Sequence, residues 1–390
     1  MTNKLYYEDP YLTTFTASII KKEPEYVIIS ETAFYPTGGG QPCDIGSLND
    51  ISVVNVEIID GEIRHFLAEP LDSQSIEVKG SINWMRRFDH MQQHAGQHIL
   101  SAAFAELFQM QTVSFHLGKE TATIDLDTTE VTEEQLKKVE ELANQIILEN
   151  RAIETKWVTE DELTQYKLRK ATSIKEDIRL VIIPDFDYNA CGGTHPSSTG
   201  QVGSIKILQT EKQKRHIRVE FVCGKRVLTQ LDRKQNVLLN LISRLSSPEE
   251  KLVDAANNLL HTNKNLEKLL NEHKQELLKF EAKELLKQSI NDIVGVTFEN
   301  RTIQDLQRLA RFLVEESPSS LCVLVSHNEE KLQIVTARGT NREESMKALL
   351  LQLLPLINGK GGGNDTLAQG GGEAALSSTE LLNKALTYIK

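Results

Sequence analysis

Cysteine is scarce in this chain of 390 residues, and its four cysteines lie far apart in the sequence. They stand at positions 43, 191, 223 and 322 and show no regular close spacing. This pattern excludes the disulfide framework that is typical of small secreted proteins. Scattered thiols fit a reducing compartment, so we expect a cytoplasmic protein.

Long apolar runs are also missing. No stretch reaches about 18 apolar residues, the length that indicates a transmembrane helix. The first ten residues lack the apolar segment of a signal peptide. Hydrophobic residues make up 39% of the sequence and charged residues 25%, which is ordinary for a globular protein in water. We therefore expect no membrane partner.

Positive charge is in deficit, since the net charge is −11. The chain as a whole is thus a poor non-specific binder of nucleic acid, because neutralising phosphates needs cations. Between residues 206 and 234, however, the sequence contains nine lysines and arginines but only three acidic residues. Smaller cationic clusters stand at 86–87 and 167–170. From the sequence, the large cluster is either a polyanion contact or a solvated face.

Two residue pairs with the spacing i, i+4 carry the main chemical signal. The first is His94 and His98, in a stretch that reads as a helix with Asp89 as its N-cap and Gln92 at the third position. Two histidines one turn apart lie on the same helical face and can reach one metal ion. We expect His90, one turn before His94, either to contact the metal ligands without binding the metal itself or simply to lie in the first turn of the helix.

The second pair is Cys191 and His195, which enclose two glycines and follow the apolar run at 180–183. The run predicts a buried strand, and the glycines let the backbone turn tightly enough to aim both side chains at one point. Each pair alone is common and weak. Together they supply four nitrogen and sulfur ligands of the kind that zinc prefers. The sequence therefore predicts one shared zinc site.

The pattern of elements predicts an α+β protein with four parts. Residues 1–85 alternate short β-prone runs with turns, which indicates a small β-barrel. Residues 86–240 mix helices and strands in an α/β domain that holds the metal site. Its expected strands, which together complete one sheet, cover residues 112–117, 121–126, 178–183, 204–208 and 217–223. Capping boxes at Thr132/Gln135 and Thr159/Glu162 predict two further helices.

The C-terminal third is predicted to hold a helical spacer, 241–290, and a small α/β domain, 291–390. Ser247 and Pro248 have the features of a helix start, and apolar residues follow at heptad spacing. This indicates a helical hairpin or a short coiled coil, buried within the chain or in a dimer. Glycine triplets at 361–363 and 370–372 flank a strand-like segment. We expect them to expose backbone to a ligand or a phosphate chain.

Several motifs, in this order, resemble the free-standing alanyl-tRNA editing proteins and the matching parts of alanyl-tRNA synthetase. They are Phe34-Tyr35-Pro36-Thr37-Gly38-Gly39-Gly40-Gln41 with Asp44 and Gly46, the His94/His98 pair, Thr112–His116, Cys191–His195 with Thr199 and Gly200, and Arg218-Val219-Glu220 with Gly224. The C-terminal glycine triplets resemble the DHHA1-type domain of the long members. The resemblance covers essentially the whole chain and leaves no room for a synthetase catalytic domain.

The resemblance implies a deacylase that hydrolyses mischarged alanine tRNA, carrying serine or glycine, without aminoacylation. It implies zinc held by four residues: His94, His98, Cys191 and His195. It points to Thr37 as the reader of the serine hydroxyl, with Gln41 and Ser114 as weaker catalytic-pocket candidates. A site that hydrogen-bonds this hydroxyl can reject alanyl esters by roughly 10⁴, because its polar groups stay unpaired without it.

Three other functions stay open at this stage. A metal phosphoesterase would need an acidic metal cluster, which Asp89-His90-Met91 does not provide. A non-catalytic RNA-binding module with structural zinc differs from an editing enzyme only in activity. Editing of threonyl-tRNA uses a similar ligand pattern, but the 38–40 loop and the C-terminal domain argue against it. A homodimer through the spacer or the C-terminal domain is likewise left open.

Overall fold

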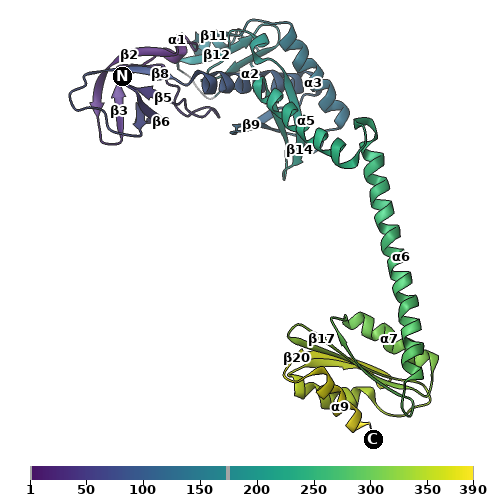
Figure 1. Ribbon diagram of the computed structural model, residues 1–390. Coiled ribbons are helices and arrows are strands. Elements are labelled where there is room, and N and C mark those ends of the chain that lie inside the picture. The colour runs from purple at the N-terminus through teal and green to yellow at the C-terminus, as the bar shows by residue number, and fades with distance from the viewer. Residues whose placement is uncertain (1, 173–175, 390) are drawn as a thin grey trace. The chain divides into compact units, whose positions relative to one another are not determined.

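The computed structural model describes residues 2–172 and 176–389 (Figure 1). These residues form two compact units, 1–240 and 241–390. The predicted barrel and central domain share the first unit, and the predicted spacer and C-terminal domain share the second. The finer division into four domains stays a prediction. Among the described residues, no helix is both long and apolar enough to cross a membrane.

A closed barrel of six strands begins the first unit. In spatial order the strands are β2 (Thr14–Lys22), β3 (Tyr26–Ile29), β7 (Glu62–Leu67), β6 (Ile51–Ile59), β5 (Gly46–Leu48) and β8 (Glu77–Ile82). Their inward side chains, among them Val27, Val56 and Val78, form its core. The β-prone runs at 13–20, 26–30, 51–59, 62–66 and 75–84 predicted five of these strands, but β5, which has only three residues, was missed. It also missed the short β1 (Asn3–Lys4), α1 (Leu5–Glu8) and β4 (Glu31–Thr32).

Two helices and a four-stranded sheet form the central core of the same unit. Helices α2 (Trp84–Phe108) and α3 (Glu133–Leu148) pack on the antiparallel sheet β14-β15-β10-β9. These strands are β14 (Ile205–Lys212), β15 (Ile217–Cys223), β10 (Ala122–Leu126) and β9 (Thr112–Leu117). Ile99, Ala103, Ile124 and Phe221 lie at the centre of this core, and none of them is exposed. The core fixes the helix on which the first histidine pair stands.

Helix α2 begins earlier than the sequence predicted. Its N-cap is Asn83, whose side chain accepts a hydrogen bond from the backbone N–H of Arg86 at 3.1 Å. Asp89 lies inside the helix and forms an ion pair with Arg226 from α5 (Lys225–Leu245). The prediction of Asp89 as the cap was wrong. An aspartate that pairs with a residue distant in the sequence cannot be told from a cap by local pattern.

The strand at 178–183 belongs to a separate sheet, which corrects the single sheet expected. This strand, β12 (Ile178–Ile183), lies between β11 (Glu154–Val158) and β13 (Asp187–Ala190). All six of its residues are buried, because Val181 faces the central core while Leu180 faces a second cluster. Both capping boxes are confirmed, at the starts of α3 and of the short α4 (Glu160–Leu163).

The second unit is a mixed sheet between two helical layers. Its order is β16 (Ile293–Glu299), β17 (Leu321–Asn328), β18 (Lys331–Arg338), β20 (Leu367–Glu373) and β19 (Lys360–Gly363). The C-terminal end of α6 (Leu252–Lys287) and α7 (Ile303–Glu316) cover one face. Helices α8 (Met346–Leu353) and α9 (Ser378–Tyr388) cover the other. The mixture of helices and strands that the sequence predicted for this part of the chain is thus present, while a separate domain at 291–390 stays a prediction.

Two details of the second unit differ from expectation. Helix α6 is one continuous helix of 36 residues rather than a hairpin, and it starts after the short 3₁₀ turn Glu249–Lys251 instead of at Ser247. The glycine triplets do not flank a strand but are themselves part of the paired strands β19 and β20, with Gly361 opposite Gly370. A Cβ atom at Gly361 would lie 2.5 Å from the Gln369 carbonyl oxygen, so glycine permits this close pairing.

Candidate metal centre

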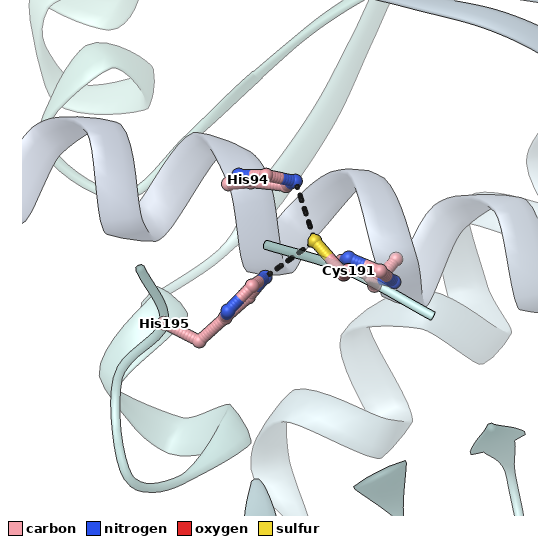
Figure 2. Close-up of side chains that lie close together, drawn as sticks. His94, Cys191 and His195 are labelled. Atoms are coloured by element: carbon pink, nitrogen blue, oxygen red, sulfur yellow. Dashed lines mark hydrogen bonds between the residues drawn. The ribbon is translucent and has the colours of Figure 1, made fainter. Parts of the chain in front are cut away.

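The four predicted ligands converge on one point. The ligand atoms of His94, His98, Cys191 and His195 all lie within 4.8 Å of one another. Figure 2 shows two imidazoles directed at the sulfur: His94 Nε2 lies 3.3 Å and His195 Nε2 3.7 Å from Cys191 Sγ. The rings of His94 and His98 stack with their centroids 5.3 Å apart, as expected one turn apart on α2. Two segments about a hundred residues apart in sequence thus build one cluster.

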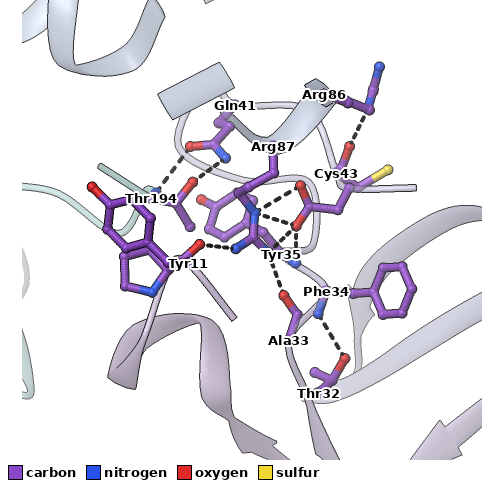
Figure 3. Close-up of polar contacts among 12 residues, drawn as sticks. Tyr11, Thr32, Ala33, Phe34, Tyr35, Gln41, Cys43, Arg86, Arg87 and Thr194 are labelled. Atoms are coloured by element: carbon purple, nitrogen blue, oxygen red, sulfur yellow. Dashed lines mark hydrogen bonds and ion pairs between the residues drawn. The ribbon is translucent and has the colours of Figure 1, made fainter. Parts of the chain in front are cut away.

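Gln41 orients His94. The backbone N–H of Thr194 donates to Gln41 Oε1 at 3.1 Å, which identifies that atom as the oxygen, and Gln41 Nε2 donates to Thr194 Oγ1 at 2.8 Å (Figure 3). His94 Nδ1 lies 2.9 Å from the same oxygen and must carry the proton. Its Nε2 atom is then unprotonated and faces the sulfur, as a metal ligand requires.

Asp187 plays the corresponding part for His98. Its carboxylate accepts a hydrogen bond from His98 Nδ1 at 3.1 Å and is itself held by Arg169 Nε at 2.7 Å. His98 Nε2 is buried and has no hydrogen-bond partner among the described residues. A buried nitrogen in this state indicates a missing partner. Carboxylates behind ligating histidines are a regular feature of zinc sites, so the donor set and its supports fit this metal.

The Cys191–His195 loop is held close to α2 by a glycine and an arginine. A Cβ atom at Gly193 would lie 2.2 Å from the ring of His94, so only glycine permits this approach. The reason for the glycine is proximity, not the tight turn that the sequence suggested. The Arg179 guanidinium donates to the carbonyl oxygens of Cys191 and Gly193, both at 2.9 Å. The loop is therefore tied to β12 and pressed against the first histidine pair.

The electrostatics of the cluster favour a cation beside the sulfur. Burial alone would raise the pKa of the Cys191 thiol, but the three neighbouring histidines hold it well below its ordinary value. Burial lowers the pKa of His195 to about 3. Burial also opposes charge on His98, yet the Cys191 thiolate and Asp187 together raise its pKa to about 9. The thiolate is the form of cysteine that zinc binds, and a bound zinc ion would take the place of the second proton on His98.

A cavity of about 420 Å³ opens onto the cluster. It is lined by His94, His98 and Cys191, by Ser114 and Phe115 of β9, and by the cationic Arg169 and Lys170. Its size lies within the range of small-molecule sites. Among the described residues, this cavity brings three of the predicted metal ligands together with side chains that could hold a substrate.

The three residues predicted as catalytic candidates lie in three different environments. Ser114 lines the cavity, and its hydroxyl donates to Asp125 at 2.6 Å. Gln41 is 1% exposed and contacts His94 rather than open space, so it supports a ligand. Thr37 is exposed on the barrel loop, where its hydroxyl accepts a hydrogen bond from the backbone N–H of Cys43 at 3.2 Å. Gly39, two residues further on, reaches the cavity.

The sequence did not identify Asp187, Arg169 and Arg179 as parts of the site. Arg169 stood in a recognised cationic cluster, but nothing local linked it to a carboxylate 18 residues away. Asp187 and Arg179 lie on β13 and β12, and their roles depend on how these strands pair. The cationic stretch 206–234 is divided in the fold. Its Lys206 pairs with Glu140 and its Arg218 with Asp125.

Known proteins with similar sequences decide the family. Residues 178–220 match the family model described as the threonyl and alanyl tRNA synthetase second additional domain. The alanyl-tRNA editing protein AlaX-L of Pyrococcus horikoshii is 33% identical to the chain over 410 aligned residues, which cover 100% of this chain and 99% of that protein. The chain belongs to the alanyl-tRNA editing proteins. This confirms the resemblance seen in the motifs.

Two further relatives of this editing protein cover different shares of it. The alanine–tRNA ligase of Pyrococcus abyssi is 32% identical over 386 residues, which cover 95% of this chain but 42% of the ligase. The alanyl-tRNA editing protein Aarsd1-A of Xenopus laevis is 36% identical over 247 residues, 62% of this chain and 60% of the relative. Both of the present chain's units therefore have counterparts in the longer ligase.

Proposed function

We propose that this editing protein is an aminoacyl-tRNA deacylase that hydrolyses the ester of mischarged alanine tRNA, with serine or glycine as the amino acid. The observation that carries the proposal is the convergence of His94, His98, Cys191 and His195 at the cavity lined by Ser114. The full-length similarity to a protein named for alanyl-tRNA editing supports the same substrate.

Zinc is the cofactor that these four residues would hold. Bound there, it would supply a Lewis acid for the ester carbonyl or a water of lowered pKa. Four protein ligands make a closed tetrahedral set, so a catalytic role needs a fifth position or one loosely held ligand. The chain's own contribution is to fix the ligand tautomers through Gln41 and Asp187 and to line the adjoining cavity.

Positioning of the substrate falls to the cavity walls. Lys170 is an exposed cation in the cavity wall and can attract the phosphate next to the terminal nucleoside, whereas Arg169 is paired with Asp187. Ser114 offers a hydroxyl held by Asp125, and Phe115 offers an aromatic face beside His94, with ring centroids 5.3 Å apart. A base can stack on such a face. These contacts would align the ester with the metal centre, and alignment is a large part of catalysis.

The selective step is assigned to Thr37. In the structure its hydroxyl accepts from the Cys43 N–H and keeps its own proton for a second partner. A serine hydroxyl would be that partner, at the end of the loop whose Gly39 lines the cavity. Glycine lacks a hydroxyl and cannot be selected in this way, so its ester needs a water in the same place.

The test is a deacylation assay with three substrates and a chelator. Seryl-tRNA and glycyl-tRNA should be hydrolysed, alanyl-tRNA should be spared, and removing the metal should abolish hydrolysis. An aminoacylation assay with alanine, ATP and tRNA should yield no product. Binding of the RNA without hydrolysis of any ester would support the alternative, a non-catalytic RNA-binding module. Preferential hydrolysis of mischarged threonine tRNA would instead identify the protein as a threonyl-tRNA editing enzyme.

A homodimer is the second part of the proposal. Helix α6 leaves leucines exposed along its length, among them Leu259, Leu266 and Leu270. Their heptad spacing fits a coiled coil with a second copy of the chain, which would bury them. Sedimentation velocity should show a dimer that Leu266→Lys with Leu270→Lys converts to a monomer. A wild-type protein that sediments as a monomer at micromolar concentration would rule out this assembly.

A further inference from the structure

A second cavity, of about 880 Å³, adjoins the metal cavity. Two elements line both of them. Helix α2 contributes His90 to the second cavity and His94 to the first, one turn or about 6 Å along the helix axis. Strand β9 contributes Leu117 to the second cavity and Phe115 to the first. The loop at 39–42 reaches both as well, so the two cavities are neighbours within the first unit.

The walls of this second cavity are cationic in a chain whose net charge is −11. Five cationic side chains face two carboxylates there: Arg86, Lys119, Lys225, Arg226 and Arg233 against Asp89 and Glu120. In the sequence, the cations at 86–87 and at 206–234 form separate clusters. The fold brings members of both clusters to one cavity. Arg86 stands on α2, and Lys225, Arg226 and Arg233 stand on α5.

One arginine fixes the shape of the cavity. Arg226 donates to both carboxylate oxygens of Asp89, at 2.9 and 2.7 Å, and to the carbonyl oxygen of Gly118 at 3.0 Å. It thereby ties α5 to α2 and to the turn after β9, and it neutralises one of the two carboxylates. The other, Glu120, lies 3.8 Å from Arg233 with both side chains largely exposed, which is a weak pairing.

His90 supplies an independent sign of a ligand. Its side chain lines the cavity, it is 3% exposed, and its Nδ1 atom is buried without a hydrogen-bond partner among the described residues. Buried polar atoms of folded proteins are nearly always paired, so an unpaired one indicates a bound water or ligand. A neutral imidazole can donate one hydrogen bond, for example to a phosphate oxygen.

We propose that this second cavity binds the phosphodiester backbone of the single-stranded nucleotides that precede the aminoacylated adenosine of the substrate. This inference rests on the proposed function, because it needs the terminal adenosine in the adjoining metal cavity. Lys119, Lys225 and Arg233 would contact phosphates on the exposed side, and Arg86 and His90 would do so deeper in the cavity. The positive walls and the volume suit a nucleotide chain rather than an apolar ligand.

The experiment measures RNA binding without any ester. Two uncharged, fluorescent RNA hairpins, one with a four-nucleotide single-stranded 3′ tail and one blunt, are titrated at several salt concentrations. The full-length test variant is Lys225→Gln with Arg233→Gln. The matched control is Lys137→Gln with Lys138→Gln, which removes the same charge from the exposed face of α3. Circular dichroism verifies that both variants are folded.

The test variant should bind the tailed hairpin about tenfold more weakly than the wild type, and the slope of log affinity against log salt should fall by about 1.4, or about 0.7 for each lost contact with single-stranded phosphate. The control should match the wild type, and binding of the blunt hairpin should not change. Equal effects of both variants, or equal loss on both hairpins, would overturn the inference. The deacylation assay tests the proposed function separately. If tail binding behaves as expected but that assay shows no ester cleavage, the proposed function fails, while the assignment of this cavity to a single-stranded 3′ end stands.

Discussion

Arg87 and Asp44 form an ion pair that is completely buried, with Arg87 Nη2 2.5 Å from Asp44 Oδ2 and both side chains inaccessible to solvent. The pair joins the barrel loop to the start of α2. Asp44 also accepts the backbone N–H of Tyr35 at 2.7 Å, and Arg87 donates to the carbonyl oxygens of Pro10 and Ala33 (Figure 3). The ion pair therefore positions the 38–40 loop relative to α2, the helix that carries His94 and His98.

Breaking this ion pair should strongly destabilise the first unit. Arg87→Met leaves the Asp44 carboxylate buried and uncompensated, which costs about 3–5 kcal/mol of unfolding free energy. Urea unfolding can be followed by the fluorescence of Trp84 and Trp157, which both lie in the first unit. The double variant Arg87→Met with Asp44→Asn should recover part of the loss. A single variant within about 0.5 kcal/mol of the wild type would contradict this assignment.

The zinc content should be one ion per chain. Cys191→Ala and His98→Ala each remove one ligand from the cluster and should lower the content sharply after dialysis against a weak chelator. Cys322→Ala, a buried thiol in the second unit, is the matched control and should keep its zinc. Elemental analysis gives the measurement. Full zinc in both ligand variants would remove the metal centre from consideration.

Gln41 should tune zinc affinity without being a ligand. Gln41→Met loses both the hydrogen bond from His94 and the contacts with Thr194, and we expect zinc affinity to fall about 10- to 100-fold. Gln41→Glu keeps an acceptor for His94 and should lose less. Competition with a fluorescent chelator orders the three proteins. Equal affinities for all three would show that Gln41 does not act through His94.

Thr37 should affect the choice of ester more than the stability of the protein. Thr37→Val keeps the shape and removes the hydroxyl, and the loss of one neutral hydrogen bond costs about 0.5–1.5 kcal/mol. The ratio of kcat/KM for seryl-tRNA over alanyl-tRNA should fall about 2- to 12-fold. Thr37→Ser, which keeps the hydroxyl, should retain the ratio. If Val and Ser variants behave alike, the hydroxyl of Thr37 plays no part in selection.

His65 should make the first unit sensitive to mild acid. It is fully buried in the barrel, with Nε2 2.8 Å from Thr32 Oγ1 and Nδ1 3.3 Å from the Val27 carbonyl oxygen. This arrangement uses the neutral ring, and burial lowers the pKa of His65 to about 4. The unfolded chain takes up the proton near its ordinary pKa of about 6.5. Stability is therefore fully present above about pH 6.5 and falls as the pH drops towards 4.

Between pH 7 and pH 5 this single histidine should cost the first unit about 2 kcal/mol. His65→Gln cannot titrate, so the difference in unfolding free energy between wild type and variant should shrink by that amount over the same interval. Urea unfolding at the two pH values gives the comparison. A difference that does not change with pH would mean that His65 is protonated in the folded barrel.

The sequence predicted well those features that depend on local pattern. The i, i+4 spacing of His94 and His98 requires only a helix, and the apolar run before Cys191 requires only a buried strand, so both were recognisable. The capping boxes at Thr132 and Thr159 satisfy backbone groups within one turn and were found for the same reason. The barrel strands followed from turns such as Asp60-Gly61, where positive φ values of 54° and 79° select these residue types.

Tertiary structure alone decided how these pieces meet. Asp89 resembles a helix cap in sequence, but Arg226, 137 residues away, makes it a partner in an ion pair. Asp187 and Gln41 reach the two histidines only because β13 and the glycine loop pack against α2. The cationic stretch 206–234 was divided by the fold between ion pairs and one cavity. Such contacts join segments distant in sequence, and their energy depends on burial and geometry that no local pattern contains.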